Sequence, residues 1–561
     1  MEKRALIALA LSLLVFLVFM YIGQKARRVP VPGAPAPQVA QPEKPAVPPK
    51  VAPPTAKIPP TAAPVTPPPR PAREVVVETP LYRAVFTELG GCLKSFQLKK
   101  YRQKLPFTPI YGLSLGPVGF EVERYQNPDT AEANFKELVR TAPGQPLPLS
   151  LGWEGSRVRI PANLFYEASA QELTLKGGKS GTLSFKAAGP GGVEIIKTYT
   201  FNPQTYVFDL EVTLINRGTA TLEGNLDLAL SVGEDSTRKG YLAFAGNVDK
   251  RFKKVYQKKV KEGKTFNGAV RWAGLDEGYF LLAMGPAGGA QSTVTVTEPS
   301  AAFLTATLKT RKSLPPGQQL KNAYTLYLGP KDLDDLKQAG LGLEQTVDFG
   351  WFHFLAMPLL YLLKYINRLF HNYGWSLVVL TILTRIVFWW PNHKSYKSMK
   401  EMQKLQPKVA KIREKYKDDR EAMNRELMAL YRTFKVNPLS GCLPMFLQLP
   451  VFIALYNILR DAIELRHASF IPTLPFTDIV WLADLSAKDP LLISPIIMGV
   501  SMVIQQKMSP SPGDPTQAKM MTFLPIIFTF LFLNFASGLV IYWLVNNVLA
   551  IVQQYFTNKY T

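Results

Sequence analysis

The hydrophobic and polar residues of the chain follow three patterns. Residues 5–22 form an uncharged, largely apolar run, residues 73 to about 340 alternate apolar and polar positions, and several apolar runs lie beyond residue 350. Alternation with a period of two is typical of half-buried β-strands, whereas a run of about 20 apolar residues can cross a bilayer as a helix. The pattern therefore predicts an all-β domain between membrane-spanning segments.

The alternating region, residues 73–345, is expected to form a large β-sandwich domain. Its strand-like segments have β-branched and aromatic residues at alternate positions, as in REVVVETPLYRAVF, VEIIKTYTF and TYVFDLEVTLINR. Turn residues such as Gly-Gly and Asn-Pro separate the segments. The region holds no convergent acid pair, metal cluster or nucleophile motif, so no chemistry is assigned to it.

The N-terminal residues 1–24 are predicted to be an uncleaved signal-anchor helix. Their apolar run of 18 residues exceeds the roughly 7–15 of a cleaved signal peptide, which is the alternative, and no clear A-x-A site follows. Prolines make up 17 of the 42 residues from Pro30 to Pro71. The segment 25–72 is therefore expected to be a semi-rigid polyproline II linker.

The C-terminal residues 371–561 are predicted to form a five-helix membrane core. The expected spans are 373–391, 443–459, 491–506, 520–535 and 538–555. The aromatic-rich segment 350–370 is too short to span before Lys364 and Arg368, so it is expected to lie in the membrane interface, with a spanning helix as the alternative.

The loop charges predict the orientation of these spans. Residues 394–435 carry 13 Lys and Arg against 6 Asp and Glu, whereas residues 461–489 carry two against five. The positive-inside rule places the first loop in the cytoplasm and the second outside. With the N-terminal anchor, the chain is expected to cross six times, with both termini cytoplasmic and residues 25–349 periplasmic.

The basic cytoplasmic segment 394–436 is predicted to be a helical hairpin. Apolar residues recur at steps of three and four on both arms, with KDDR at 417–420 as the turn and Pro407 as a kink in the first arm. The alternative is a solvated charged loop that only fixes the topology. The apolar seam favours the folded hairpin.

Arg385 places a permanent charge inside the span 373–391. An arginine at the bilayer centre costs about 2.5–3.5 kcal/mol on insertion scales, unless its side chain snorkels to the headgroups. Thr381 lies on the same helix face, Gln505 and Gln506 approach the cytoplasm at similar depth, and Gln448 interrupts a third span. These residues favour a hydrated cavity over snorkelling. Such a positively charged groove would lower the cost of carrying a hydrophilic tail partway across.

Other chemistry is not indicated. Two cysteines are too few for a disulfide framework or a structural zinc site, and the HExxH motif is absent. The GGKS sequence at 177–180 resembles the end of a phosphate-binding loop, but Leu173 stands where the first glycine is required. We therefore expect no metal, no cofactor and no enzymatic activity.

The C-terminal motifs resemble the YidC family of membrane protein insertases, of the long Gram-negative type. They are TRIVFWWPNHKSYKSMKEMQKLQPK (384–408), KVNPLSGCLPMFLQLPVFIALYNILR (435–460), IELRHASF (463–470), DLSAKDPLLISPIIMGVSMVIQQKMSP (484–510) and ASGLVIYWLVNN (536–547). The resemblance implies a β-supersandwich outside the inner membrane and a hydrophilic groove open to cytosol and lipid. Residues matching its groove positions are Arg385, Thr381, Gln505, Gln506, Tyr542 and Trp543.

The resemblance also implies partners. These are nascent membrane proteins, the Sec translocon, membrane lipids and the ribosome. The chain ends at NKYT, without the long basic tail that some relatives use for ribosome contact. Ribosome contact is therefore expected at the 394–436 hairpin and the 507–519 loop. A transporter or channel is the competing function, and a membrane anchor for an outer binding domain is a third.

Overall fold

The computed structural model describes most of the chain beyond residue 70. The described residues are 71–115, 118–125, 134–155, 158–260, 262–289, 291–434, 436, 443–508 and 515–560. The expected signal-anchor helix 1–24 and nearly all of the linker 25–72 lie outside them.

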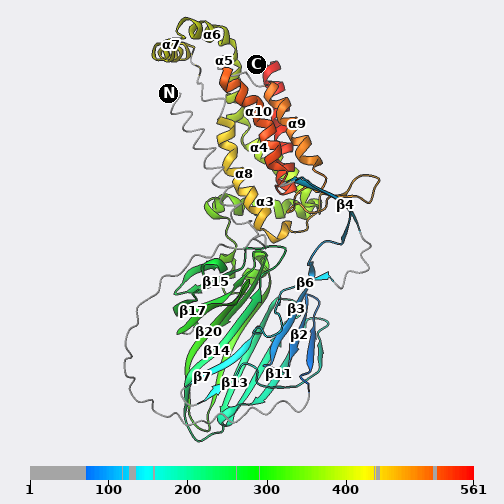
Figure 1. Ribbon diagram of the computed structural model, residues 1–561, viewed down its shortest axis with the longest axis vertical. Coiled ribbons are helices and arrows are strands. Elements are labelled where there is room, and N and C mark those ends of the chain that lie inside the picture. Colours follow the sequence, from blue (N-terminus) through cyan, green and yellow to red (C-terminus); the bar gives the residue numbers. More distant parts are fainter. Residues whose placement is uncertain are drawn as a thin grey trace, which may run out of the picture. The chain divides into compact units, whose positions relative to one another are not determined.

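The β domain contains two main sheets (Figure 1). The smaller has the strand order β10 (Glu172–Thr174), β1 (Glu74–Glu78), β2 (Tyr82–Thr87), β3 (Cys92–Arg102) and β6 (Phe135–Glu137). The larger has the order β8 (Arg159–Ile160), β7 (Ser150–Gly155), β14 (Leu222–Gly233), β20 (Phe303–Leu314), β19 (Gln291–Ser300), β17 (Lys264–Asp276), β18 (Phe280–Pro286), β21 (Gln319–Pro330), β13 (Val207–Asn216), β12 (Val193–Phe201), β11 (Gly181–Ala188) and β9 (Glu167–Ala168), and β15 (Ala243–Val248) and β16 (Arg251–Tyr256) extend from β17.

Two short hairpins complete the described strands. One joins β4 (Phe107–Leu115) to β5 (Val118–Tyr125), and the other joins β22 (Ile471–Thr473) to β23 (Val480–Leu482). An isolated bridge between Arg124 and Ile479 connects them. The segment 471–482 thereby pairs with the hairpin that follows β3 in the chain.

Strand β12 shows how the period of two builds the sandwich. Its odd-numbered residues are buried and its even-numbered residues are half-buried, because successive side chains of a strand point to opposite faces. The inward residues are Val193, Ile195, Lys197, Tyr199 and Phe201. Four are apolar or aromatic and pack into the core, whereas the fifth is a lysine.

Lys197 is fully buried and its charge is satisfied by backbone oxygens. Its Nζ donates to the carbonyl oxygens of Gly90 (3.1 Å), Gly91 (2.6 Å) and Leu149 (2.8 Å). The ammonium also lies over the ring of Tyr199, at 5.6 Å from the ring centre. Burial lowers the pKa of Lys197 to about 8. The lysine thus ties β12 to the turn before β3 and to the residue before β7.

Helix α2 (Leu333–Gln338) follows β21, and three aspartates lie at its start. Asp332 caps it by accepting hydrogen bonds from the backbone N–H groups of Asp334 and Asp335. Asp334 also pairs with Lys364 of the next long helix, at 3.0 Å. Burial and then the charge of Asp332 raise the pKa of Asp335 to about 6, whereas the bond with Lys364 lowers the pKa of Asp334.

We expect Asp335→Asn to stabilise the protein at pH 7.5 by about 1 kcal/mol, and Asp334→Asn to destabilise it. A raised carboxyl pKa contributes stability that is present below the ordinary value of 3.8 and is lost as the pH rises through about 6. The gain from Asp335→Asn should therefore shrink towards pH 4. Thermal unfolding of the full chain in detergent at both pH values measures it. A lower melting temperature for Asp335→Asn at pH 7.5 would contradict this assignment.

The C-terminal region is helical. It contains α3 (His353–Phe370), α4 (Tyr373–Val387), α5 (Trp389–Lys404), α6 (Gln406–Lys415), α7 (Arg420–Thr433), α8 (Leu443–Asp461), α9 (Ile493–Met508), α10 (Pro515–Phe532) and α11 (Ser537–Tyr560). Helix α11 packs against α4, α5, α8 and α9 (Figure 1). By length and hydropathy, the segment Ser537–Thr557 suffices to cross a membrane, and the pair α4 and α5 suffices if it counts as one bent span.

The first predicted span differs from the observed helices. We expected it to run from residue 373 to 391, but α4 ends at Val387 and α5 begins at Trp389 with the axis turned by 64°. Phe388 lies between them with φ −90° and ψ 7°, outside the helical range. Pro391 cannot donate a backbone hydrogen bond, so it suits the first turn of a new helix better than the interior of a continuous one.

Beyond the bend, α5, α6 and α7 occupy the segment predicted as a hairpin. The helix is interrupted at Leu405, which separates α5 from α6, and Pro407 lies in the first turn of α6. Asp419 caps α7 by accepting from the backbone N–H groups of Glu421 and Ala422. Helices α6 and α7 contact each other, and Val409 and Leu427 are buried.

The expected loop 507–519 is shorter than predicted. Residues 507 and 508 close α9, and α10 already begins at Pro515. A proline at the first helical position has a pre-set φ angle and loses no helical hydrogen bond, which explains the early start. The remaining residues 509–514 lie outside the described part of the chain.

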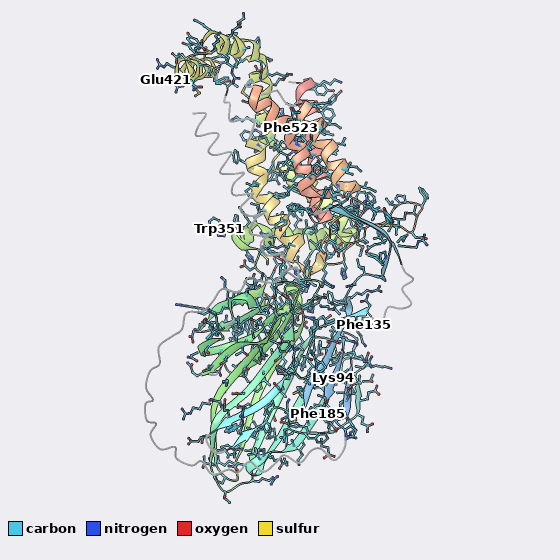
Figure 2. The ribbon with its side chains drawn as sticks, viewed as in Figure 1. Lys94, Phe135, Phe185, Trp351, Glu421 and Phe523 are labelled. Atoms are coloured by element: carbon cyan, nitrogen blue, oxygen red, sulfur yellow. The ribbon has the colours of Figure 1, made fainter. Side chains whose placement is uncertain are left out.

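Helix α3 has two faces. Ala356, Leu359, Leu360, Leu363 and Ile366 are buried against α4 and α8. The residues of the opposite side that remain exposed are largely aromatic, with Trp351 (Figure 2) 96% exposed just before the helix and Phe354 72% exposed. Such a distribution is typical of a helix that meets lipid or headgroups on one side.

Candidate functional site

Arg385 and Thr381 lie on the inner face of α4. Arg385 is in the last turn and is 7% exposed, and Thr381 is fully buried one turn earlier. The Thr381 hydroxyl donates to the carbonyl oxygen of Leu377 at 2.7 Å, so its donor is satisfied within its own helix. The helix spacing places both polar groups among the other helices of the bundle.

The Arg385 guanidinium has a neutral partner. Its Nη2 donates to the hydroxyl of Tyr396 on α5 at 3.0 Å, and its Nε is buried without a hydrogen-bond partner. Among the residues that the structure describes, no acidic side chain forms an ion pair with it. A buried cation with unused donor capacity is suited to binding an anionic or polar acceptor.

Tyr542 and Trp543 lie in the second turn of α11. The Tyr542 hydroxyl accepts a hydrogen bond from Gln448 of α8 and lies within electrostatic reach of Arg385. Trp543 is half-buried and its ring contacts Phe452, Phe528 and Phe532, with ring centres 5.1–5.9 Å apart. Its Nε1 is buried without a hydrogen-bond partner. Gln448 and Tyr542 therefore form a hydrogen-bonded pair between α8 and α11, and Arg385 and Tyr396 form a second pair between α4 and α5.

Gln505 and Gln506 lie near the end of α9, which packs against α10 and α11. Both side chains are half-buried. The sequence predicted polar site residues on α4, α9 and α11, and in the structure Arg385 of α4 pairs with Tyr396 and Tyr542 of α11 pairs with Gln448.

Further polar contacts inside the bundle were missed from the sequence. Asn547 donates to Ser501 at 3.1 Å, Gln553 to the carbonyl oxygen of Trp389 at 3.1 Å, and Gln554 to that of Met508 at 2.8 Å. The signal was available as polar residues that recur on one apolar helix. Among the described residues, no group of three His, Cys, Asp or Glu side chains could hold a metal ion.

Comparison with known proteins identifies the family. The model described as "60Kd inner membrane protein" matches residues 365–561, and the model of the YidC periplasmic domain matches residues 118–362. The Membrane protein insertase YidC of Syntrophus aciditrophicus is 41% identical over the full length of both chains. That of Geobacter metallireducens is 40% identical, covering all of this chain and 98% of the relative.

Among solved structures, the chain is similar to an active YidC insertase crystal structure with the first transmembrane domain resolved. The identity is 20%, the TM-score is 0.36, and the match covers 88% of this chain and 93% of the other. The full-length relatives at 40% identity or above carry the assignment. On their evidence, this chain belongs to the YidC family of membrane protein insertases.

Proposed function

We propose that this insertase receives the hydrophilic tail of a nascent membrane protein in a groove lined by Arg385, Thr381, Gln505, Gln506, Tyr542 and Trp543. The family assignment makes the protein a membrane protein insertase of the inner membrane, not an enzyme, with nascent membrane proteins as its substrates. The observation that carries the groove is the buried Arg385 side chain, whose Nε has no hydrogen-bond partner.

The groove would act by reducing the desolvation cost of a polar tail. A hydrophilic segment in hydrocarbon loses its hydrogen bonds to water, at several kcal/mol for each unsatisfied group. Arg385 offers a donor and a positive charge in its place, and Gln448 and Tyr542 offer further polar atoms. The driving force would come from the neighbouring apolar segment, because burying each large apolar side chain in lipid is worth about 1.5–3 kcal/mol.

We propose six crossings, with the N- and C-termini in the cytoplasm and residues 25–349 in the periplasm. The match to the YidC periplasmic domain supports the outer location of the β domain. The excess of basic residues in 394–435 supports a cytoplasmic position for α5, α6 and α7. In this arrangement the exposed aromatic residues of α3 would lie in the outer headgroup region.

The partners follow from the same arrangement. The hairpin 394–436 and the segment 507–519 would both face the cytoplasm, where their basic residues could contact ribosomal RNA and anionic lipid. Emerging chains would come from the ribosome, alone or through the Sec translocon. The alternative, a transporter or channel, gains no support from the relatives, which are named insertases.

Site-specific crosslinking to ribosome-stalled nascent chains tests the groove. A photo-crosslinking residue at Thr381 or Trp543 should capture a single-spanning substrate while its tail crosses. The matched control is Ile527 of α10, an apolar position that is 59% exposed. Crosslinks confined to the β domain, or equal yields from Thr381 and from Ile527, would exclude the groove.

A further inference from the structure

The hydrogen bond between Arg385 and Tyr396 crosses the bend between α4 and α5. The two residues are eleven positions apart, a separation of about 16 Å along the axis of a straight helix. The 64° bend brings their side chains together at 3.0 Å. Both side chains are buried, at 7% and 5% exposure. The contact therefore depends on the angle between a helix of the membrane core and the first helix of the basic hairpin.

Contacts with α11 also hold the start of α5. Gln553 of α11 donates to the backbone carbonyl of Trp389 at 3.1 Å, and Thr557 of α11 lies 3.3 Å from the Nδ1 of His393. These bonds hold the first turns of α5 against α11. The Tyr396 hydroxyl is the contact that ties α5 to the charged group of the proposed groove.

A phenol is a replaceable partner for a guanidinium. Hydrogen bonds from arginine to a carboxylate are shorter and about twice as strong as those to a neutral oxygen. A carboxylate arriving at Arg385 would therefore compete with the Tyr396 hydroxyl. Once that hydroxyl is displaced, α5 loses its contact with Arg385. The Arg385–Tyr396 hydrogen bond then no longer restrains the angle between α4 and α5.

We infer that Tyr396 is a positioning residue that holds Arg385 in the empty insertase and releases the base of the hairpin when an acidic segment binds. This inference rests on the proposed function, because it requires Arg385 to contact the passing chain. It adds a means by which occupancy of the groove inside the membrane changes the position of α5, α6 and α7 on the cytoplasmic side.

The test compares Tyr396→Phe with Tyr416→Phe in the full-length protein. Tyr396→Phe keeps the ring and removes the hydroxyl, and Tyr416→Phe removes a hydroxyl from the far end of α6. Spin labels at Glu421→Cys on α7 and Phe523→Cys on α10 (Figure 2), with Cys442→Ser, report the hairpin position by pulsed electron resonance. Photo-crosslinking from Thr381 measures the yields with which acidic and neutral nascent tails of equal length are captured.

We expect an acidic tail to broaden the distribution of distances between the labels at 421 and 523 in the unaltered protein. Tyr396→Phe should show the same broadened distribution without substrate. Crosslinking of the acidic tail should rise about threefold to tenfold relative to the neutral tail, because the competing hydroxyl is gone. Tyr416→Phe should match the unaltered protein in both measurements.

Two results would overturn the inference while leaving the groove intact. In the first, the unaltered protein crosslinks normally from Thr381, and Tyr396→Phe changes neither the distance between the two spin labels nor the ratio of acidic to neutral tails that are crosslinked. The other is an equal loss of crosslinking for both tails with a lower melting temperature, which would make Tyr396 only structural. Absence of crosslinks from Thr381 in the unaltered protein would instead remove the groove and the inference together.

Discussion

Lys197→Met is expected to destabilise the β domain by about 3–5 kcal/mol. The substitution keeps an unbranched side chain of nearly the same length, but it leaves the buried carbonyl oxygens of Gly90 and Leu149 without their lysine donor. The carbonyl oxygen of Gly91 keeps only the hydrogen bond from the Tyr199 hydroxyl. Each orphaned buried acceptor costs about 1–3 kcal/mol, offset in part because a charged group no longer has to be buried. Thermal unfolding of the full-length protein in detergent, followed by the circular dichroism of its strands, measures the loss.

The control is Lys186→Met on the neighbouring strand β11. Lys186 pairs with Glu194 at the surface, with its side chain 63% exposed, so its removal should change stability by less than about 0.5 kcal/mol. The difference between Lys197→Met and the unaltered protein should widen as the pH rises from 8 towards 10. Burial lowers the pKa of Lys197 to about 8, so over that interval the unfolded chain binds more protons than the folded protein. The folded unaltered protein therefore becomes more stable as the pH rises. Equal melting temperatures for the two variants would show that Lys197 is dispensable.

Arg385→Ala is expected to reduce insertion of a substrate with an acidic tail about tenfold, and of one with a neutral tail less than twofold. The loss of a charge-assisted hydrogen bond of about 1.5 kcal/mol corresponds to a factor of about ten. Arg385→Glu should be worse for the acidic tail, because a buried carboxylate repels the incoming charge. Protease protection of radiolabelled substrates in proteoliposomes measures insertion directly.

Arg425→Ala is the matched control for that experiment. Arg425 lies on α7 with its side chain 78% exposed, so its removal deletes the same charge from the basic hairpin and leaves the polar contacts around Arg385 intact. It should lower insertion of both tails equally or not at all. An equal loss for acidic and neutral tails in Arg385→Ala would show that Arg385 supports the fold of the bundle and does not select the tail.

The regular elements were predictable because their signals are local. The alternation of VEIIKTYTF corresponds to β12, residue for residue, and the apolar runs correspond to α8, α9, α10 and α11 within a few residues at most ends. In both cases the order of apolar and polar residues within one short segment indicates which side chains are buried. The position of Thr381 and Arg385 on one helix face followed from the same rule.

The tertiary partners were not predictable from the sequence. A fully buried lysine at position 197 contradicts the ordinary preference for exposed lysines, and its three acceptors come from segments 48 to 107 residues away. The bend at Phe388 replaced the continuous span that hydropathy suggested. The pairing of Arg385 with Tyr396 depends on that bend, so the nearest partner of the membrane arginine could not be derived from spacing alone.

The strand order also constrains how the β domain is assembled during export. β21, the last strand of the large sheet to be made, lies between β18 and β13 and pairs with both. Until residues 319–330 have emerged in the periplasm, the large sheet remains two separate halves with open inner edges. The domain must therefore wait for its C-terminal strand, and its unpaired edges remain open to misassociation and periplasmic chaperones throughout that delay.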